Sequence, residues 1–179
     1  MAAASPFSPN LFAQRLIVGV CDFSVSNDAG VVLSTYALGS CVAVIAYEPH
    51  RKVGGIIHFM LPHSTASPER AARHPAMFAN TGLPLFFRAL AGLKVSTANL
   101  RFALTGGAAV LCGTDPFRIG ERNADAARSF LVEQSCAWEH EEIGGSHNRA
   151  VHLEMRTGEV TVQSPAATTR WSLTAPVLA

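Results

Sequence analysis

The sequence predicts an α/β fold, a mixed-sheet sandwich with flanking helices. Of its 179 residues, 49% are hydrophobic and 15% are charged, which is enough apolar material for one core without disulfide or metal support. Short extended apolar runs occur in adjacent pairs along the chain, whereas only two segments show helical spacing. Because strands and helices do not alternate strictly, a Rossmann arrangement is disfavoured.

The two ends of the chain differ in composition from its middle. Residues 1–14 contain many Ala, Ser and Pro residues and predict a loose N-terminal tail, and residues 165–179 predict an irregular C-terminal tail. A single domain is expected between them, at residues 15–164. The N-terminus lacks the charged start and apolar core of a signal peptide, and no apolar run reaches membrane-spanning length. We therefore expect a cytoplasmic protein with reduced cysteines.

The elements of the domain follow from side-chain periodicity and turn residues. The segment 42–47 is apolar on both faces, which indicates a central buried strand. Apolar residues at helical spacing predict helices at 77–93 and 121–134, and Pro84 suits a first-turn position with Asn80 or Thr81 as the cap. The segment 63–74 resembles a surface loop. The remaining strands are predicted at 15–24, 31–34, 53–60, 100–104, 149–155 and 159–163.

Charge and cysteine spacing exclude several classes of function. The formal net charge is +1 and the basic residues are scattered, so no nucleic-acid surface is indicated. The four cysteines, at positions 21, 41, 112 and 136, form no C-x-x-C motif, which disfavours a zinc ribbon or a thioredoxin-type site. His58 and His63 lack further ligands at a diagnostic spacing, so we expect neither a metal nor a cofactor.

One cysteine and one histidine stand in a pattern that suits catalysis. Cys41 follows Gly39 on a predicted turn, and His58 ends the next extended run, so the two side chains can meet in space. That pairing predicts a thiol nucleophile with its base, as a thiolate–imidazolium pair. Thr35 would orient the His58 imidazole if the chain turns back at residues 37–39, between Thr35 and Cys41. The structural alternative stays open, because isolated cysteines and strand-end histidines are most often packing residues.

Main-chain groups near the cysteine are candidates for binding the substrate. The N–H groups around Gly39, Ser40 and Cys41 could stabilise an oxyanion, and the turn at Gly106 and Gly107 could line the site. Ser40 is a poor candidate nucleophile, because the Gly-x-Ser-x-Gly pattern fails at Val42.

Taken together, these phrases resemble the CheD family of chemoreceptor glutamine deamidases. The resemblance covers roughly residues 16–163. It rests on Leu33-Ser34-Thr35, on Leu38-Gly39-Ser40-Cys41-Val42-Ala43-Val44, on the run from Gly54 to Pro62, on Gly106-Gly107-Ala108, on Ile119-Gly120-Glu121-Arg122-Asn123, on Gly144-Gly145 and on Thr157-Gly158-Glu159-Val160. The chain departs from the family pattern at Ile57, Thr105 and Ala109.

The resemblance implies a function as well as a fold. It implies a Cys-His-Thr triad of Cys41, His58 and Thr35 that hydrolyses glutamine side chains of methyl-accepting chemoreceptors to glutamate and ammonia, in chemotaxis adaptation and without a cofactor. It implies the α/β sandwich of the cytotoxic necrotizing factor deamidases. The implied partners are the cytoplasmic domain of a chemoreceptor and a CheC-type phosphatase.

Two other functions stay open at this point. A signalling adaptor would bind receptor or phosphatase with dispensable catalysis, and a thiol hydrolase or transglutaminase would act on another substrate. The other three cysteines are expected to be packing residues. Glu121, Arg122 and Asn123 are expected to form a helix start with local ion pairs.

Overall fold

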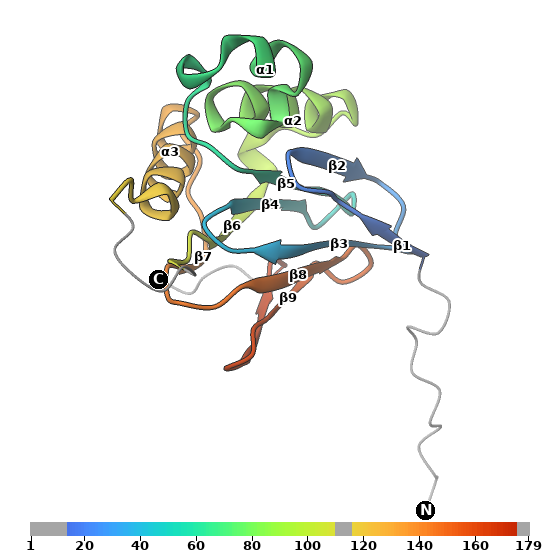
Figure 1. Ribbon diagram of the computed structural model, residues 1–179. Coiled ribbons are helices and arrows are strands. Elements are labelled where there is room, and N and C mark those ends of the chain that lie inside the picture. The colour runs from blue at the N-terminus through green and yellow to red at the C-terminus, as the bar shows by residue number, and fades with distance from the viewer. Residues whose placement is uncertain (1–13, 110–115, 175–179) are drawn as a thin grey trace, which may run out of the picture.

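The computed structural model describes residues 14–109 and 116–174 and contains two five-stranded sheets packed face to face (Figure 1). Sheet A has the order β1 (Gln14–Ile17), β3 (Val31–Leu38), β8 (Arg149–Glu154), β9 (Glu159–Gln163), β10 (Thr168–Ser172). Sheet B has the order β2 (Asp22–Ser26), β5 (Val53–Phe59), β4 (Val42–Glu48), β6 (Arg101–Gly106), β7 (His140–Ile143). The pairs β1–β3 and β6–β7 are parallel and the others antiparallel, which confirms the predicted mixed-sheet sandwich.

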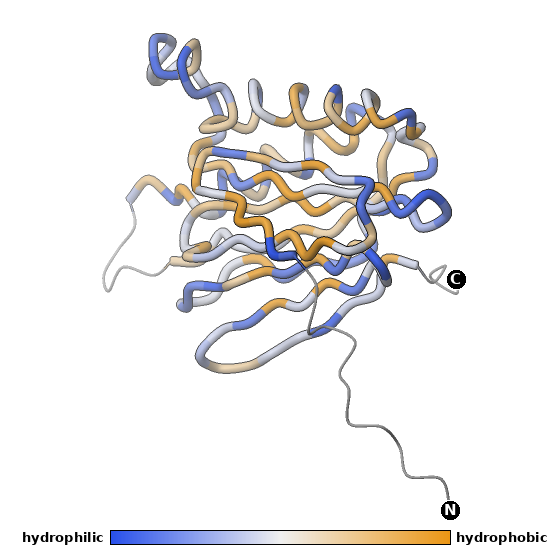
Figure 2. Tube along the Cα trace, turned by 90° about the vertical axis from the view of Figure 1, so that its right-hand side faces the viewer, coloured by the Kyte–Doolittle hydropathy of each residue, from blue (hydrophilic) through white to orange (hydrophobic). Residues whose placement is uncertain are grey.

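Helices cover the outer face of sheet B (Figure 1). They are α2 (Ala79–Gly92) and α3 (Ile119–Glu133). The short helix α1 (Pro68–Arg73) has no buried residue and packs beside the 3₁₀ turns at Ser64–Ala66 and Pro75–Met77, and a further 3₁₀ turn lies at Thr97–Asn99. Sheet B is therefore the middle layer, and β4 and β5 are buried along their whole length. Strands β8 and β9 alternate between buried and exposed positions because the outer face of sheet A meets solvent. The tube in Figure 2 shows this contrast in hydropathy.

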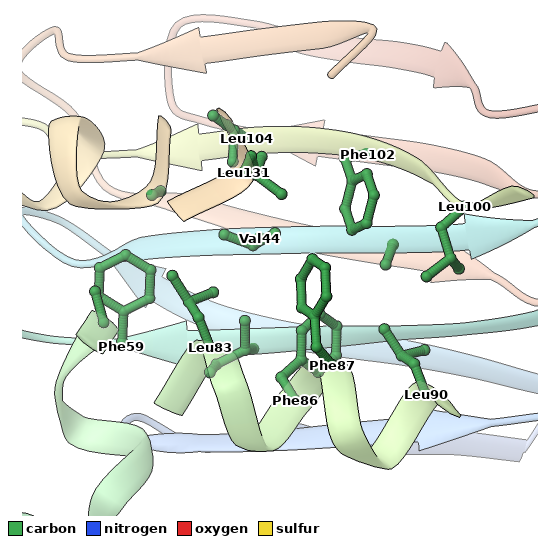
Figure 3. Close-up of a cluster of buried hydrophobic side chains, with 14 of the residues drawn as sticks. Val44, Phe59, Leu83, Phe86, Phe87, Leu90, Leu100, Phe102, Leu104 and Leu131 are labelled. Carbon is green, nitrogen blue, oxygen red and sulfur yellow. The ribbon is translucent and has the colours of Figure 1, made fainter. Parts of the chain in front are cut away.

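Two hydrophobic clusters hold the three layers together. The first joins α2 and α3 to sheet B and includes Phe59, Phe86, Phe87 and Phe102, and Figure 3 shows the rings of Phe86, Phe87 and Phe102 close together. The second fills the space between the sheets with side chains such as Leu33, Ile45, Ile56 and Leu153. Alternate residues of β4 serve the two clusters, because Val42 and Val44 face the helices whereas Ala43 and Ile45 face sheet A.

Some predicted elements have other boundaries in the structure. The expected strand at 15–24 is wrong as one element, since β1 and β2 belong to different sheets and residues 18–21 cross between them. Helix α2 begins at Ala79, so Pro84 is an interior residue rather than a first-turn one. The carbonyls of Leu61 and Pro62 accept the N–H groups of Ala79 and Asn80, which satisfies the first turn without a side-chain cap.

Three elements were not predicted. The segment 63–74, expected to be a loop, contains α1, and polar strand β7 was missed because its side chains are only partly buried. The C-terminal segment, expected to be irregular, contains β10, which pairs antiparallel with β9. Exposed and half-buried side chains alternate along β10. Its polar sequence follows from its place at the edge of sheet A. The N-terminal tail falls almost entirely outside the described residues, apart from Gln14.

We predict that Phe86→Ala lowers the free energy of unfolding by about 3–5 kcal/mol, because it removes a fully buried ring from the helix-facing core. That ring also makes an edge contact with Phe23, at 6.0 Å between centroids. Urea denaturation measures the change. Val132→Ala is the control, since this side chain is 65% exposed and its loss should alter stability by less than about 0.5 kcal/mol. Equal effects of the two substitutions would contradict the assigned core.

Candidate active site

The three residues of the predicted triad come together where the two sheets face each other. Thr35 lies in β3 of sheet A, and His58 lies in β5 of sheet B; both are fully buried. Cys41 is half-buried and immediately precedes β4, packed against the cluster between the sheets. Ala43 pairs with His58 across β4 and β5, which makes Cys41 and His58 diagonal neighbours on the same face.

A hydrogen bond of 2.8 Å joins Thr35 Oγ1 to His58 Nδ1 and links the two sheets. The bond holds the imidazole ring in one orientation, because the ring is enclosed between the layers. The other ring nitrogen, Nε2, is buried and has no hydrogen-bond partner among the described residues. The ring therefore has one nitrogen occupied by the threonine and one free for a reaction.

The turn before Cys41 is fixed by backbone contacts. Ala37 has a φ of 58°, and the N–H of Gly39 donates to the carbonyl of Ala37 at 3.0 Å. From the end of β6, the N–H of Gly107 donates to the carbonyl of Cys41 at 2.8 Å. Gly106 has a φ of 113°, and a Cβ there would lie 2.3 Å from the carbonyl oxygen of Cys41. Glycine is therefore required for β6 to approach the turn this closely.

These contacts define what the candidate binding groups do. The N–H groups of Gly39 and Gly107 are used inside the protein, so neither is a free donor toward a substrate. Ser40 directs its carbonyl toward the side chain of Asn123. Gly107 also lines a surface groove together with Gly120 and Gly144, whereas Gly106 supports the turn that carries Cys41.

Burial decides the resting protonation of the two reactive groups. Desolvation raises the pKa of the Cys41 thiol to about 11, with a further contribution from the nearby Cys21 and an opposing one from its own backbone N–H. Desolvation lowers the pKa of His58 to about 4. At neutral pH, thiol and imidazole are therefore both uncharged. Burial disfavours the charged form of each group and so opposes the expected thiolate–imidazolium pair.

Cys21 is an unexpected feature of the site. It has a φ of 62°, in the left-handed region, and its N–H donates to the carbonyl of His58 at 2.9 Å. The next residue, Asp22, pairs with His58 in the sheet. Cys21 also contributes to the raised pKa of the Cys41 thiol, which the sequence did not indicate. Cys136 packs against the helix-facing core as expected, and Cys112 lies outside the described residues.

Asn123 is also closer to the site than the sequence indicated. It was expected to belong to a helix start with local ion pairs, and Glu121 does pair with Arg118. Asn123 instead is fully buried and donates to two backbone carbonyls beside the triad. The signal available in the sequence was its position four residues after Ile119, on the inward face of α3.

Two further features bear on the class of protein. The described residues contain no group of three or more metal-ligating side chains close together. No helix in the described ranges, 14–109 and 116–174, is long and apolar enough to cross a membrane. A thiol beside an imidazole that a third group orients is the arrangement used by cysteine-dependent hydrolases.

Comparison with known proteins identifies the family. The family model described as CheD chemotactic sensory transduction matches residues 60–164. The chain is 44% identical to the probable chemoreceptor glutamine deamidase CheD 1 of Syntrophus aciditrophicus, over 83% of this chain and 93% of the relative. It is 38% identical to the probable chemoreceptor glutamine deamidase CheD of Syntrophotalea carbinolica, over 84% and 94% of the two chains. The chain belongs to the CheD family.

We predict that Cys21→Ser lowers the pKa of the Cys41 thiol, because it removes a neighbouring group that becomes negatively charged at alkaline pH. The pH dependence of Cys41 alkylation by iodoacetamide, followed by peptide mass spectrometry, measures that pKa. Cys136→Ser is the matched control and should leave the midpoint unchanged. A midpoint that stays in place or rises in Cys21→Ser would show that the two thiols do not interact.

Proposed function

We propose that this chain is a protein-glutamine deamidase that converts glutamine side chains of chemoreceptors to glutamate with release of ammonia. Family membership and the names of the relatives support the deamidase activity. The observation that carries the mechanism is the 2.8 Å hydrogen bond from Thr35 to the His58 ring, beside the turn of Cys41. In this proposal Cys41 is the nucleophile, His58 the general base and acid, and Thr35 the positioning residue.

The uncharged resting pair defines the first step. In this step His58 carries its proton on Nδ1, in the hydrogen bond to Thr35 Oγ1, which leaves the Nε2 lone pair unpaired and available to the thiol. As Cys41 Sγ bonds to the amide carbon of the glutamine, the thiol proton passes to His58 Nε2. The imidazolium then gives this proton to the amide nitrogen, the carbon–nitrogen bond breaks and ammonia leaves.

The second step regenerates the thiol. The product of the first step is a thioester between Cys41 and the glutamyl side chain. Water loses a proton to His58 Nε2 and attacks the thioester carbon, and the sulfur leaves with that proton. The products are glutamate and the resting thiol. An amine in place of water would give transglutamination through the same thioester.

The backbone N–H of Cys41 is the proposed oxyanion donor. This N–H opposes the rise in the pKa of the Cys41 thiol, and we therefore propose it as the donor near the reacting carbon. The N–H groups of Gly39 and Gly107 are used elsewhere. A donor fixed at the turn before β4 would stabilise the charge that develops on the amide oxygen as the tetrahedral intermediate forms.

The surface near the site suits a protein substrate. Ile17, Val20 and Tyr36 are 69%, 47% and 39% exposed, and they lie in segments beside Thr35 and Cys21. Exposed apolar side chains of this kind are typical of protein-binding surfaces. With a net charge of +1, we propose that receptor docking depends on shape and apolar contact rather than on long-range attraction. A CheC-type phosphatase would bind the same face.

We predict that the wild-type protein converts glutamine to glutamate on a chemoreceptor cytoplasmic fragment, with a mass gain of about 1 Da per event. Cys41→Ala and His58→Ala should abolish the conversion, because each removes a group that exchanges a bond or a proton with the substrate. Thr35→Val should slow it by roughly 10²-fold through misorientation of the base, and Thr35→Ser should restore most of the rate. Tandem mass spectrometry and ammonia release measure the products.

Cys136→Ala is the control and should deamidate at the wild-type rate. Turnover that survives Cys41→Ala would refute the thiol mechanism. Binding of the fragment without turnover by the wild type would favour the adaptor function, and incorporation of an added amine would favour transglutamination.

We also predict the acid limit of activity. Because the pKa of His58 is lowered to about 4, the base stays neutral well below the usual range of histidine. As pH falls, kcat/KM should hold to about pH 5 and decline about tenfold per pH unit below pH 4. A plot of kcat/KM against pH checks this, with receptor integrity verified at each pH. A decline centred near pH 6.5 would show that the imidazole is solvated.

A further inference from the structure

Asn123 connects the two segments that carry the cysteine and the histidine. Its side-chain nitrogen Nδ2 donates to the carbonyl of Ser40 at 2.9 Å and to the carbonyl of Met60 at 2.8 Å. Ser40 directly precedes Cys41, and Met60 follows His58 by two residues. One amide group from α3 therefore contacts both segments at once.

These contacts lie where the sheet no longer fixes the two segments to each other. The ladder between β4 and β5 ends at the pair Val42–Phe59, and Ser40 and Met60 lie beyond it. The two hydrogens of the Asn123 side-chain amide link the chain segments just beyond the last paired residues of β4 and β5. Without them, the turn that carries Cys41 would be tied to β6 but not to β5, the strand of His58.

The start of α3 is built to bring Asn123 to this point. Gly120 contacts Gly107 backbone to backbone, and a Cβ at Gly120 would lie 2.3 Å from the carbonyl oxygen of Gly107. Asn123 follows on the same face of the helix, one turn later. The phrase from Ile119 to Asn123 thus combines a glycine for close approach with an amide for the two carbonyls.

The burial of Asn123 carries a cost that its two donated hydrogen bonds must offset. Its Oδ1 is buried and has no hydrogen-bond partner among the described residues, which is unfavourable for a group of this kind. Neighbouring inward positions of α3 hold apolar side chains such as Ala124, Ala127 and Leu131. An amide at position 123 is explained by its two donated hydrogen bonds, since an apolar residue would fill the space without an unpaired oxygen.

We infer that Asn123 is a positioning residue, which holds the Cys41 turn against the His58 strand so that the sulfur faces Nε2. This inference rests on the proposed function only in taking Cys41 as the nucleophile and His58 as its base. Asn123 touches neither the substrate nor the reacting atoms, and it acts through the backbone of Ser40 and Met60.

The test compares Asn123→Ala with Leu131→Ala, a large-to-small change in the same helix at a fully buried site two turns away. On a chemoreceptor cytoplasmic fragment, Asn123→Ala should lower kcat by roughly 10²-fold with KM within about twofold, because a displaced nucleophile slows chemistry without altering docking. Leu131→Ala should leave kcat within about threefold at a temperature where near-ultraviolet circular dichroism shows both variants folded. Should Asn123→Ala not fold, Asn123→Ser keeps one donor. It should also lower kcat with little change in KM, but by a smaller factor.

A second readout is independent of turnover. The rate of Cys41 alkylation by iodoacetamide at pH 7, divided by the rate with the thiol fully ionised, reports the assistance of the imidazole. This ratio should fall in Asn123→Ala to the level of His58→Gln and stay near the wild-type value in Leu131→Ala. If the wild type shows no deamidation and the alkylation ratios still differ between the variants as expected, the proposed function fails and the inference stands. A folded Asn123 variant with unchanged kcat and ratio, or equal losses in Leu131→Ala, would overturn it.

Discussion

The hydrogen bond between Thr35 Oγ1 and His58 Nδ1 is the interaction on which the rest of the site depends. It joins a strand of sheet A to a strand of sheet B in a space where both partners are fully buried. The bond can form only because the sheets pack face to face, with Leu33 and Ile56 setting their separation on the same faces as Thr35 and His58. A single contact between the layers thus occupies Nδ1 of the ring and leaves Nε2 without a partner among the described residues.

Burial gives this site its chemical character. A middle layer enclosed on both faces removes water from His58 and from much of Cys41, which favours the neutral form of each group. In the proposed mechanism the base is therefore available over a wide range of pH, and the thiol is activated when its proton moves to the imidazole during attack. In that mechanism, separate charges form only during the reaction, when the proposed donor, the backbone N–H of Cys41, would stabilise the negative charge.

Local patterns in the sequence predicted much of this arrangement. The turn at Gly39, the buried strand that begins at Val42 and the histidine at the end of the next strand all follow from glycine, β-branched and apolar spacing. The proximity of Cys41 and His58 follows because adjacent antiparallel strands place diagonal neighbours on one face. The approach of Thr35 was predicted from a chain reversal, whereas in the structure it depends on the packing of two sheets.

The remainder depends on long-range packing that local patterns do not contain. Residues 15–24 resemble one strand, yet the chain crosses from one sheet to the other there, and this crossing places Cys21 beside the site. Asn123 was assigned to a helix start because its two carbonyl partners lie more than sixty residues away in the sequence. The raised pKa of the thiol follows from the packing of Cys41 against the cluster between the two sheets, which no motif around Cys41 reveals.

The most direct test of this account is the protonation of the His58 ring, measured by ¹⁵N nuclear magnetic resonance at neutral pH. The seven histidines of the chain can be distinguished by comparison with His58→Gln. The account predicts a neutral ring with the proton on Nδ1, in the bond to Thr35, and an unprotonated Nε2. A proton on Nε2, or a doubly protonated ring at pH 7, would contradict it, because the nitrogen that faces the thiol could not then accept a proton.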